Sequence, residues 1–224
     1  MTEITEHLRE IRERVSRATR ASGSDTIIVA VSKQQSVSAI ESAYAAGLRH
    51  FGENYLQEAL PKIAALANAE IEWHFIGAVQ ANKTRAIAES FHWVHTIDRE
   101  KIAVRLNAAR PYFAAPLNVL IQVNLAREPQ KAGVTEEEVP PLAAAIRELP
   151  RLALRGLMCM PPAAAGADER RALFTRTSEL ARELRALGHR ADVLSMGMSD
   201  DFELAIECGA TCVRLGTAIF GPRA

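Results

Sequence analysis

The chain has no excess of charge of either sign. Its 224 residues include 27 basic and 27 acidic side chains, so the formal net charge at pH 7 is zero. These charges are interspersed along the chain, which leaves no overall field to attract nucleic acid or anionic lipid. We therefore expect no nucleic acid and no membrane surface among its partners.

Cysteine is scarce. Cys159, Cys208 and Cys212 are too few and too scattered for a disulfide framework. The last two lack the second pair of ligands that a zinc site of this spacing would need. This usage is typical of a protein in a reducing compartment.

Long hydrophobic runs are absent as well. No segment approaches 18 consecutive apolar residues, the length at which a transmembrane helix is considered. The N-terminal stretch MTEITEHLREIRERV is charged and amphipathic, unlike a secretory signal peptide. We expect a soluble, cytoplasmic protein.

The sequence does contain a regular alternation of short apolar segments and amphipathic helices. Ile4, Leu8, Ile11 and Val15 recur at helical spacing and predict a helix over residues 3–21, with Gly23 at its end. Ser36 is placed to cap a second helix that stops at Gly47. The eight apolar segments are IIVAVSK, LRHFGEN, EWHFIG, WVHTID, NVLIQVN, LRGLMCM, DVLSMGM and TCVRLG. Further helices are predicted over 55–68, 81–90, 99–109, 136–149, 168–187 and 200–208.

Eight strands that alternate with helices indicate right-handed βαβ units and a parallel sheet that closes into a (β/α)8 barrel of the TIM type. The chain stops soon after the eighth segment, so we expect the helix at 3–21 to complete the outer ring. A doubly wound open sheet is the competing fold, but SKQQSV stands where its G-x-G-x-x-G motif would follow the first strand. We predict that residues 1–224 form a single barrel domain.

Lys33 follows the first apolar segment, TIIVAVSK. Because side chains alternate along a strand, Lys33 shares a face with Val31, Val29 and Ile27. An ammonium group on that face would lie at the mouth of the barrel. The alternative is that Lys33 has left the strand and points to water.

Polar residues also end the other predicted strands. Active-site groups of barrels come from these strand ends, and phosphate sites usually follow strands seven and eight. A lysine amine forms an imine with a carbonyl when it is neutral, and burial or a nearby cation such as Arg214 favours that form. The combination suggests a phosphorylated aldehyde as ligand. The strand-end residues are Lys33, Glu53, Asn54, His74, Gly77, Asp98, Asn124, Met158, Met160, Ser195, Ser199, Arg214, Gly216 and Thr217.

Each of these residues also has a structural interpretation. Ser199 or Asp200 could cap the following helix, with Glu203 closing a capping box. Arg214 could pair with a carboxylate inside the barrel, Gly216 could mark a strand end, and Asn54 could be a turn residue.

The histidines raise the question of a metal. His92 and His95 stand three apart on a strand and so point to opposite faces, which argues against a shared metal. His74 is expected to be a hydrogen-bonded core histidine.

Several motifs together resemble the pyridoxal phosphate homeostasis protein family, over about residues 5–223. The motifs are VAVSKQQ, FGENYLQEA, EWHFIGAVQANK, HTID, NVLIQVN, LRGLMCMP, LSMGMSDDFELAI and VRLGTAIFG. The resemblance implies a barrel like the N-terminal domain of alanine racemase that holds pyridoxal 5'-phosphate (PLP) as a Schiff base. By matching motifs, Lys33 would be the imine lysine and Arg214 would face the pyridine nitrogen. Ser195 and the backbone of Gly216 and Thr217 would hold the phosphate, and Asn54 would lie beside the ring.

The resemblance further implies a role in vitamin B6 and amino-acid homeostasis, with PLP-dependent apoenzymes as candidate partners. We expect no catalytic residues, because an arginine at the pyridine nitrogen opposes its protonation and so weakens the electron sink. The chain also ends where the second domain of alanine racemase, with its catalytic tyrosine, would begin. We expect a monomer. Two alternatives remain: a low-activity amino-acid racemase, and an aldolase that forms an imine between a lysine and a sugar phosphate.

Overall fold

The computed structural model describes residues 3–22 and 25–222, and their strands form a closed parallel barrel. Each strand pairs with its neighbours in sequence, and Ile27 to Ala30 pair with Cys212 to Leu215 to close the ring. The predicted (β/α)8 barrel is confirmed, and the open doubly wound sheet is excluded. The strands are β1 (Ile27–Val31), β2 (His50–Glu53), β3 (Glu72–Phe75), β4 (Trp93–Ile97), β5 (Leu117–Val123), β6 (Leu152–Cys159), β7 (Val193–Ser195) and β8 (Cys212–Leu215).

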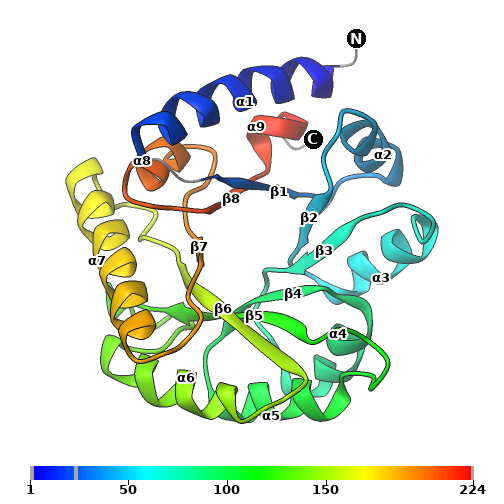
Figure 1. Cartoon of the computed structure of the whole chain (residues 1–224). Coiled ribbons are helices and arrows are strands. Elements are labelled where there is room, and N and C mark those ends of the chain that lie inside the picture. Colours follow the sequence, from blue (N-terminus) through cyan, green and yellow to red (C-terminus); the bar gives the residue numbers. More distant parts are fainter. Residues whose placement is uncertain (1–2, 23–24, 223–224) are drawn as a thin grey trace.

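Helices surround the barrel on the outside (Figure 1). They are α1 (Glu3–Ser22), α2 (Val37–Ala45), α3 (Leu56–Ala65), α4 (Thr84–Ser90), α5 (Glu100–Ala109), α6 (Val139–Arg147), α7 (Ala167–Ala186), α8 (Phe202–Glu207) and α9 (Thr217–Phe220), with 3-10 turns at Ala81–Lys83 and Glu136–Glu138. Among the described helices, none combines the length and apolar character needed to cross a membrane.

Helix α1 completes the outer ring, as predicted. It packs against α8, α9 and α2, in the space beside β8 and β1 (Figure 1). Its apolar stripe is buried, with Leu8 at 0%, Ile11 at 3% and Val15 at 8% exposure. The expected stop at Gly23 lies outside the described residues.

Local signals around α2 also agree with the prediction. The Ser36 hydroxyl accepts a hydrogen bond from the backbone N–H of Ala39, which caps the helix. Gly47 follows with φ = 93°, a left-handed conformation that glycine adopts without strain. The chain therefore turns there into β2.

The barrel separates two apolar regions. The larger region lies between the strands and the helices, where both layers bury their apolar faces. A smaller cluster contains Val29, Trp93, Leu120, Met158, Val193 and Cys212, one residue from each of six strands. Val29 belongs to this smaller cluster, and Val31 on the same face of β1 lines a cavity. The face of β1 that carries Lys33 is therefore the interior of the barrel.

Candidate functional site

A cavity of about 480 Å³ lies at the carboxyl ends of the strands. This volume is within the range of sites for small molecules. Five of the six predicted binding residues line it: Lys33, Asn54, Arg214, Gly216 and Thr217. The remaining lining residues are Val31, Ile76, Gly77, Ala78, Thr96, Gln122, Gln130, Lys131, Ala132, Met158, Met160, Met198, Ser199 and Asp200.

Lys33 follows β1 and is half-buried at the wall of this cavity. The next residue, Gln34, has φ = 61°, a left-handed conformation that is uncommon for residues other than glycine. Its backbone N–H donates to Glu58 Oε2 at 2.9 Å. The chain is therefore held in a tight turn immediately after the lysine, which favours the interior position over the alternative that Lys33 points to bulk water.

The residue before Lys33 is held by a buried ion pair. Glu53 Oε1 accepts a hydrogen bond from Ser32 Oγ at 2.7 Å and one from Lys62 Nζ at 2.8 Å. Lys62 Nζ also donates to the backbone carbonyl of Ser32 at 2.8 Å. Burial raises the pKa of Glu53, and the hydrogen bonds from Lys62 and Ser32 oppose that rise. Residues of β2 and α3 thus fix the backbone on both sides of Lys33.

Arg214 extends from β8 into the same cavity and is 6% exposed. Its Nη1 donates to the carbonyl and the hydroxyl oxygens of Ser195, each at 2.7 Å, and its Nη2 donates to the carbonyl of Cys159 at 3.2 Å. These bonds occupy three of the five N–H groups of a guanidinium. Burial lowers the pKa of Arg214, but an arginine stays protonated in proteins. No carboxylate pairs with it in the described chain, so the structural alternative of an ion pair inside the barrel is wrong.

A group of small and hydroxyl-bearing residues lies where β8 ends. Thr217 Oγ1 lies 3.2 Å from Ser199 Oγ, and the backbone N–H of Ala218 donates to that same Ser199 oxygen at 3.3 Å. Gly216 precedes α9, whose first N–H groups have no partner inside the helix. This corner of the cavity offers N–H and O–H donors to an anion.

Ser195 does not line the cavity, unlike Ser199. Its side chain is 0% exposed and lies behind Arg214, with Oγ 2.8 Å from His95 Nδ1. The structure thus brings Ser199, rather than Ser195, beside Gly216 and Thr217. The alternative that Ser199 or Asp200 caps α8 is wrong, because the N-cap residue is Asp201, whose side chain makes no cap bond. Glu203 bonds to Arg14 of α1 instead of closing a box with Asp200.

Asn54, which follows β2, borders the same cavity. Its Oδ1 is buried without a hydrogen-bond partner among the described residues, although the side chain borders the cavity. The backbone of Asn54 also contacts Gly77, where an added Cβ would stand 2.0 Å from the Asn54 carbonyl oxygen. Glycine at position 77 therefore allows this wall of the cavity to form.

His74 is a buried, hydrogen-bonded core histidine, as predicted. Its ring lies 3.0 Å from His50 and 2.8 Å from His95, measured between ring nitrogens. Within the described residues no group of three or more His, Cys, Asp or Glu side chains is arranged to hold a metal ion. The three histidines therefore contact one another.

Sequence reasoning missed a second lysine at the cavity. Lys131 lies in the loop after β5, where it pairs with Glu128 at 2.6 Å and donates to the carbonyl of Pro161 at 3.1 Å. Asn124 holds this loop through bonds from its side-chain amide to the carbonyls of Glu128 and Lys131. Asn124 at the end of the fifth predicted strand indicated that a loop begins there. The spacing of residues in the sequence did not show that this loop folds back over the barrel.

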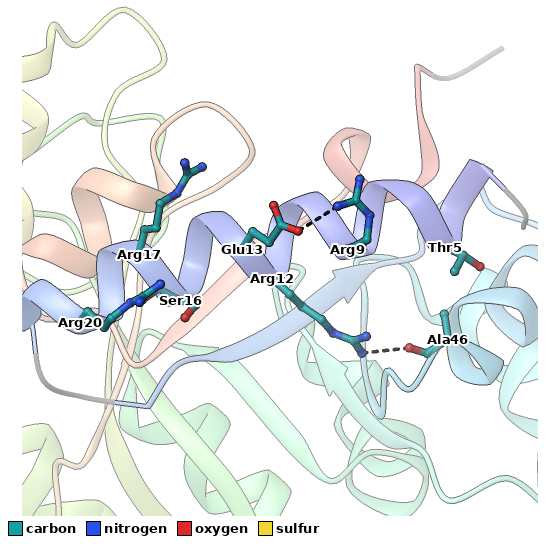
Figure 2. Close-up of a pocket in the computed structure, with 8 residues that line it drawn as sticks. All are labelled: Thr5, Arg9, Arg12, Glu13, Ser16, Arg17, Arg20 and Ala46. Atoms are coloured by element: carbon teal, nitrogen blue, oxygen red, sulfur yellow. Dashed lines mark hydrogen bonds and ion pairs between the residues drawn. The ribbon is translucent and has the colours of Figure 1, made fainter.

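A larger groove of about 630 Å³ runs along α1 and differs in kind from this cavity. Figure 2 shows that arginines of α1 dominate it, and none of its lining residues borders the cavity at the strand ends. Arg9 pairs with Glu13 at 2.9 Å, and Arg12 donates to the carbonyl of Ala46 at 2.9 Å (Figure 2). These are exposed side chains that interact with their own helix and with its neighbour α2.

Residues 7–224 match the family model of the alanine racemase N-terminal domain. A pyridoxal phosphate homeostasis protein of Pseudomonas aeruginosa is 51% identical over 226 residues, which cover 100% of this chain and 97% of the relative. The chain belongs to the pyridoxal phosphate homeostasis protein family.

Solved structures of the family share the same barrel. PipY of Synechococcus elongatus, without PLP, is 37% identical and superposes with a TM-score of 0.89 over 98% of this chain and 100% of that one. The same protein with PLP bound has a TM-score of 0.85 with the same coverage of both chains. The family assignment and the fold therefore agree.

Proposed function

We propose that this member of the pyridoxal phosphate homeostasis family binds PLP in the cavity at the barrel mouth and serves PLP and amino-acid homeostasis without substantial turnover. The observation that carries the proposal is the convergence of Lys33, Arg214 and the corner at Ser199 and Thr217 on one cavity of about 480 Å³. The PLP-bound structure of PipY supports it. When bound, PLP supplies an aldehyde that condenses with amines and a pyridine ring that can accept electrons.

The residues present fit this ligand. The hydroxyls of Ser199 and Thr217 and the backbone at Gly216 would hold the phosphate, since they offer uncharged donors at one corner. Ser195, the hydroxyl that the resemblance assigned to the phosphate, would act one layer deeper through Arg214. Asn54, with its unpartnered buried Oδ1, would lie beside the ring.

Lys33 would form the Schiff base. Its amine would condense with the aldehyde of PLP, with loss of one water molecule. The ammonium group must lose its proton before this bond can form. The turn at Gln34 and the ion pair of Glu53 with Lys62 hold the backbone of Lys33 in place for this bond.

Arg214 also supports the absence of substantial turnover. A guanidinium has only donors, so it cannot accept a hydrogen bond from a protonated pyridine nitrogen, and its charge disfavours the protonated ring. A racemase further needs an acid or base on the opposite face of the substrate. Within the described chain the cavity lining includes no tyrosine, and Tyr55, at the start of α3 near the rim, is 52% exposed. We therefore propose a carrier of PLP rather than an enzyme.

Titration of the ligand-free protein with PLP tests this function. We expect visible absorbance from the imine in the wild type, its loss in Lys33→Ala, and its retention in Lys131→Ala, which removes the other lysine of the cavity. An imine that persists in Lys33→Ala would contradict the assignment. Incubation of the PLP-bound protein with single L-amino acids distinguishes the racemase, because sustained formation of the D-enantiomer would contradict a non-catalytic role.

A further inference from the structure

Three histidines form a continuous hydrogen-bonded line inside the barrel behind Arg214. His95 Nδ1 lies 2.8 Å from Ser195 Oγ, and His95 Nε2 lies 2.8 Å from His74 Nδ1. His74 Nε2 lies 3.0 Å from His50 Nδ1. Ser195 in turn accepts from Arg214 Nη1 at 2.7 Å. The line therefore joins the cavity to His50, at the first residue of β2.

The protons in this line have a preferred direction. Arg214 can only donate, so the Ser195 oxygen accepts from it and has one proton of its own to donate. Burial, followed by the charge of Arg214, lowers the pKa of His95 to about 3, so this ring is neutral and carries one N–H. If Ser195 donates to His95 Nδ1, then His95 donates from Nε2 to His74, and His74 donates from Nε2 to His50. Each ring nitrogen that faces another residue of the line then has a hydrogen-bond partner of the matching kind.

The opposite arrangement of protons is less favourable at Ser195. His95 would donate from Nδ1 to Ser195, whose oxygen would then accept two bonds and whose proton would need another acceptor. One acceptor within its reach is the sulfur of Cys212, a weak acceptor in a residue that is 1% exposed. A buried hydroxyl proton with so poor a partner is costly.

The surroundings keep the line neutral and rigid. The ring of Trp93 stacks on His74 at 5.4 Å with an interplanar angle of 9°. Burial lowers the pKa of His74 well below its usual value, and the neighbouring histidines lower it further. Arg214 at the inner end does not release its proton. The line thus delivers no proton to the cavity, and its effect is on geometry.

We propose that His95, supported by His74 and His50, is a positioning residue for Arg214. By accepting a hydrogen bond from the Ser195 hydroxyl, His95 turns the lone pairs of that oxygen toward the guanidinium and fixes which N–H groups of Arg214 face the cavity. The proposal rests on the proposed function, because the group that Arg214 would contact in the cavity is the pyridine nitrogen of PLP. Neither His50 nor the other two histidines line the cavity, so they act only through Ser195 and Arg214.

The first test uses the protein without PLP, so that its outcome does not depend on the proposed function. Histidine side-chain ¹⁵N NMR of the full chain reports which ring nitrogen carries the proton. We expect protonated Nε2 and unprotonated Nδ1 in both His95 and His74. A proton on His95 Nδ1 would overturn the proposal.

The second test measures PLP affinity and the absorption maximum of the PLP-bound protein for His95→Leu and His95→Asn. Leucine removes the acceptor for Ser195, and we expect about tenfold weaker binding and a shifted absorption maximum. Asparagine supplies an oxygen near the position of Nδ1, and we expect affinity within about threefold of the wild type. His189→Leu, outside the barrel interior, is the control.

The outcomes separate the possibilities. An equal loss of PLP affinity in His95→Leu and His95→Asn would overturn the proposal, because a hydrogen-bond acceptor for Ser195 would then not matter. Wild-type affinity in both variants would overturn it as well. If His95→Leu does not fold, His95→Asn and the NMR measurement still decide. Failure of the wild type to bind PLP would refute the proposed function instead, while the proton positions would stand as measured.

Discussion

Lys62 Nζ lies 2.8 Å from Glu53 Oε1, and both side chains are buried beneath the turn that carries Lys33. Replacing Lys62 by methionine would leave the Glu53 carboxylate without its cation. Breaking one side of a buried pair costs about 3–5 kcal/mol of unfolding free energy, because the remaining charge is uncompensated. Urea denaturation checks this value.

The double variant Lys62→Met with Glu53→Gln tests the cause of that loss. Since the amide is neutral, we expect it to recover most of the lost stability. Arg85→Ala, which breaks the exposed pair with Glu89, serves as the control and should leave the midpoint unchanged. If the double variant is no more stable than Lys62→Met alone, the loss comes from packing and not from charge.

Gly77→Ala should disrupt the wall of the cavity. The new Cβ would meet the carbonyl oxygen of Asn54 at 2.0 Å, so the backbone must move. We expect a loss of about 1–3 kcal/mol or more in stability, together with weaker PLP binding. Gly166→Ala is the matched control, since its added Cβ would meet nothing within 4 Å. Thermal melts and PLP titration of both variants check the prediction, and equal behaviour of the two would contradict it.

Arg214→Gln should weaken the retention of PLP. The glutamine keeps hydrogen-bonding capacity but loses the charge and the fork that bonds to Ser195 and Cys159. We expect about ten- to a hundredfold weaker binding and a changed absorption spectrum. Arg155→Gln is the control: this arginine lies over the Trp93 ring and bonds to Asp192, outside the lining of the cavity. Unchanged affinity and spectrum in Arg214→Gln would mean that Arg214 is structural.

The buried histidines should make the fold sensitive to acid. Burial lowers the folded-state pKa of His95 to about 3 and that of His74 well below 6.5. The unfolded chain therefore binds more protons than the folded one below about pH 6.5, so stability falls as the pH falls from there toward the folded pKa values. Each histidine contributes a slope of about 1.4 kcal/mol per pH unit within its window.

Denaturation midpoints between pH 7 and pH 4 check this prediction. His95→Asn should have a shallower pH dependence than the wild type by about one proton, whatever its stability at pH 7. An identical slope in the two proteins would show that His95 does not bind a proton on unfolding in this range.

The periodic features of the fold were predictable from sequence. Alternation along β1 put Lys33 on the same face as Val29 and Val31, and helical spacing in α1 identified the stripe at Leu8 and Ile11 that is buried. Both predictions depend only on the geometry of a single element. Five of the six predicted binding residues line the cavity for a related reason, since each lies at or just after the carboxyl end of a strand.

The arrangement of Ser195 and Ser199 was not predictable. Ser195 ends β7 and Ser199 follows it in the next loop, which turns at Gly197, whose φ of 92° brings Ser199 to Thr217. The line of histidines was missed for a similar reason. His50 and His74 belong to different strands, and the register that pairs Gly52 with His74 brings the two histidine rings together, which no single segment encodes.

The central claim is that the amine of Lys33 binds the aldehyde of PLP in the barrel mouth. The most direct test is borohydride reduction of the PLP-loaded wild-type protein, followed by peptide mapping with mass spectrometry. We predict that the reduced pyridoxyl group is found on the peptide that contains Lys33. A label confined to the peptide that contains Lys131, or a loaded protein in which no lysine is labelled, would contradict it.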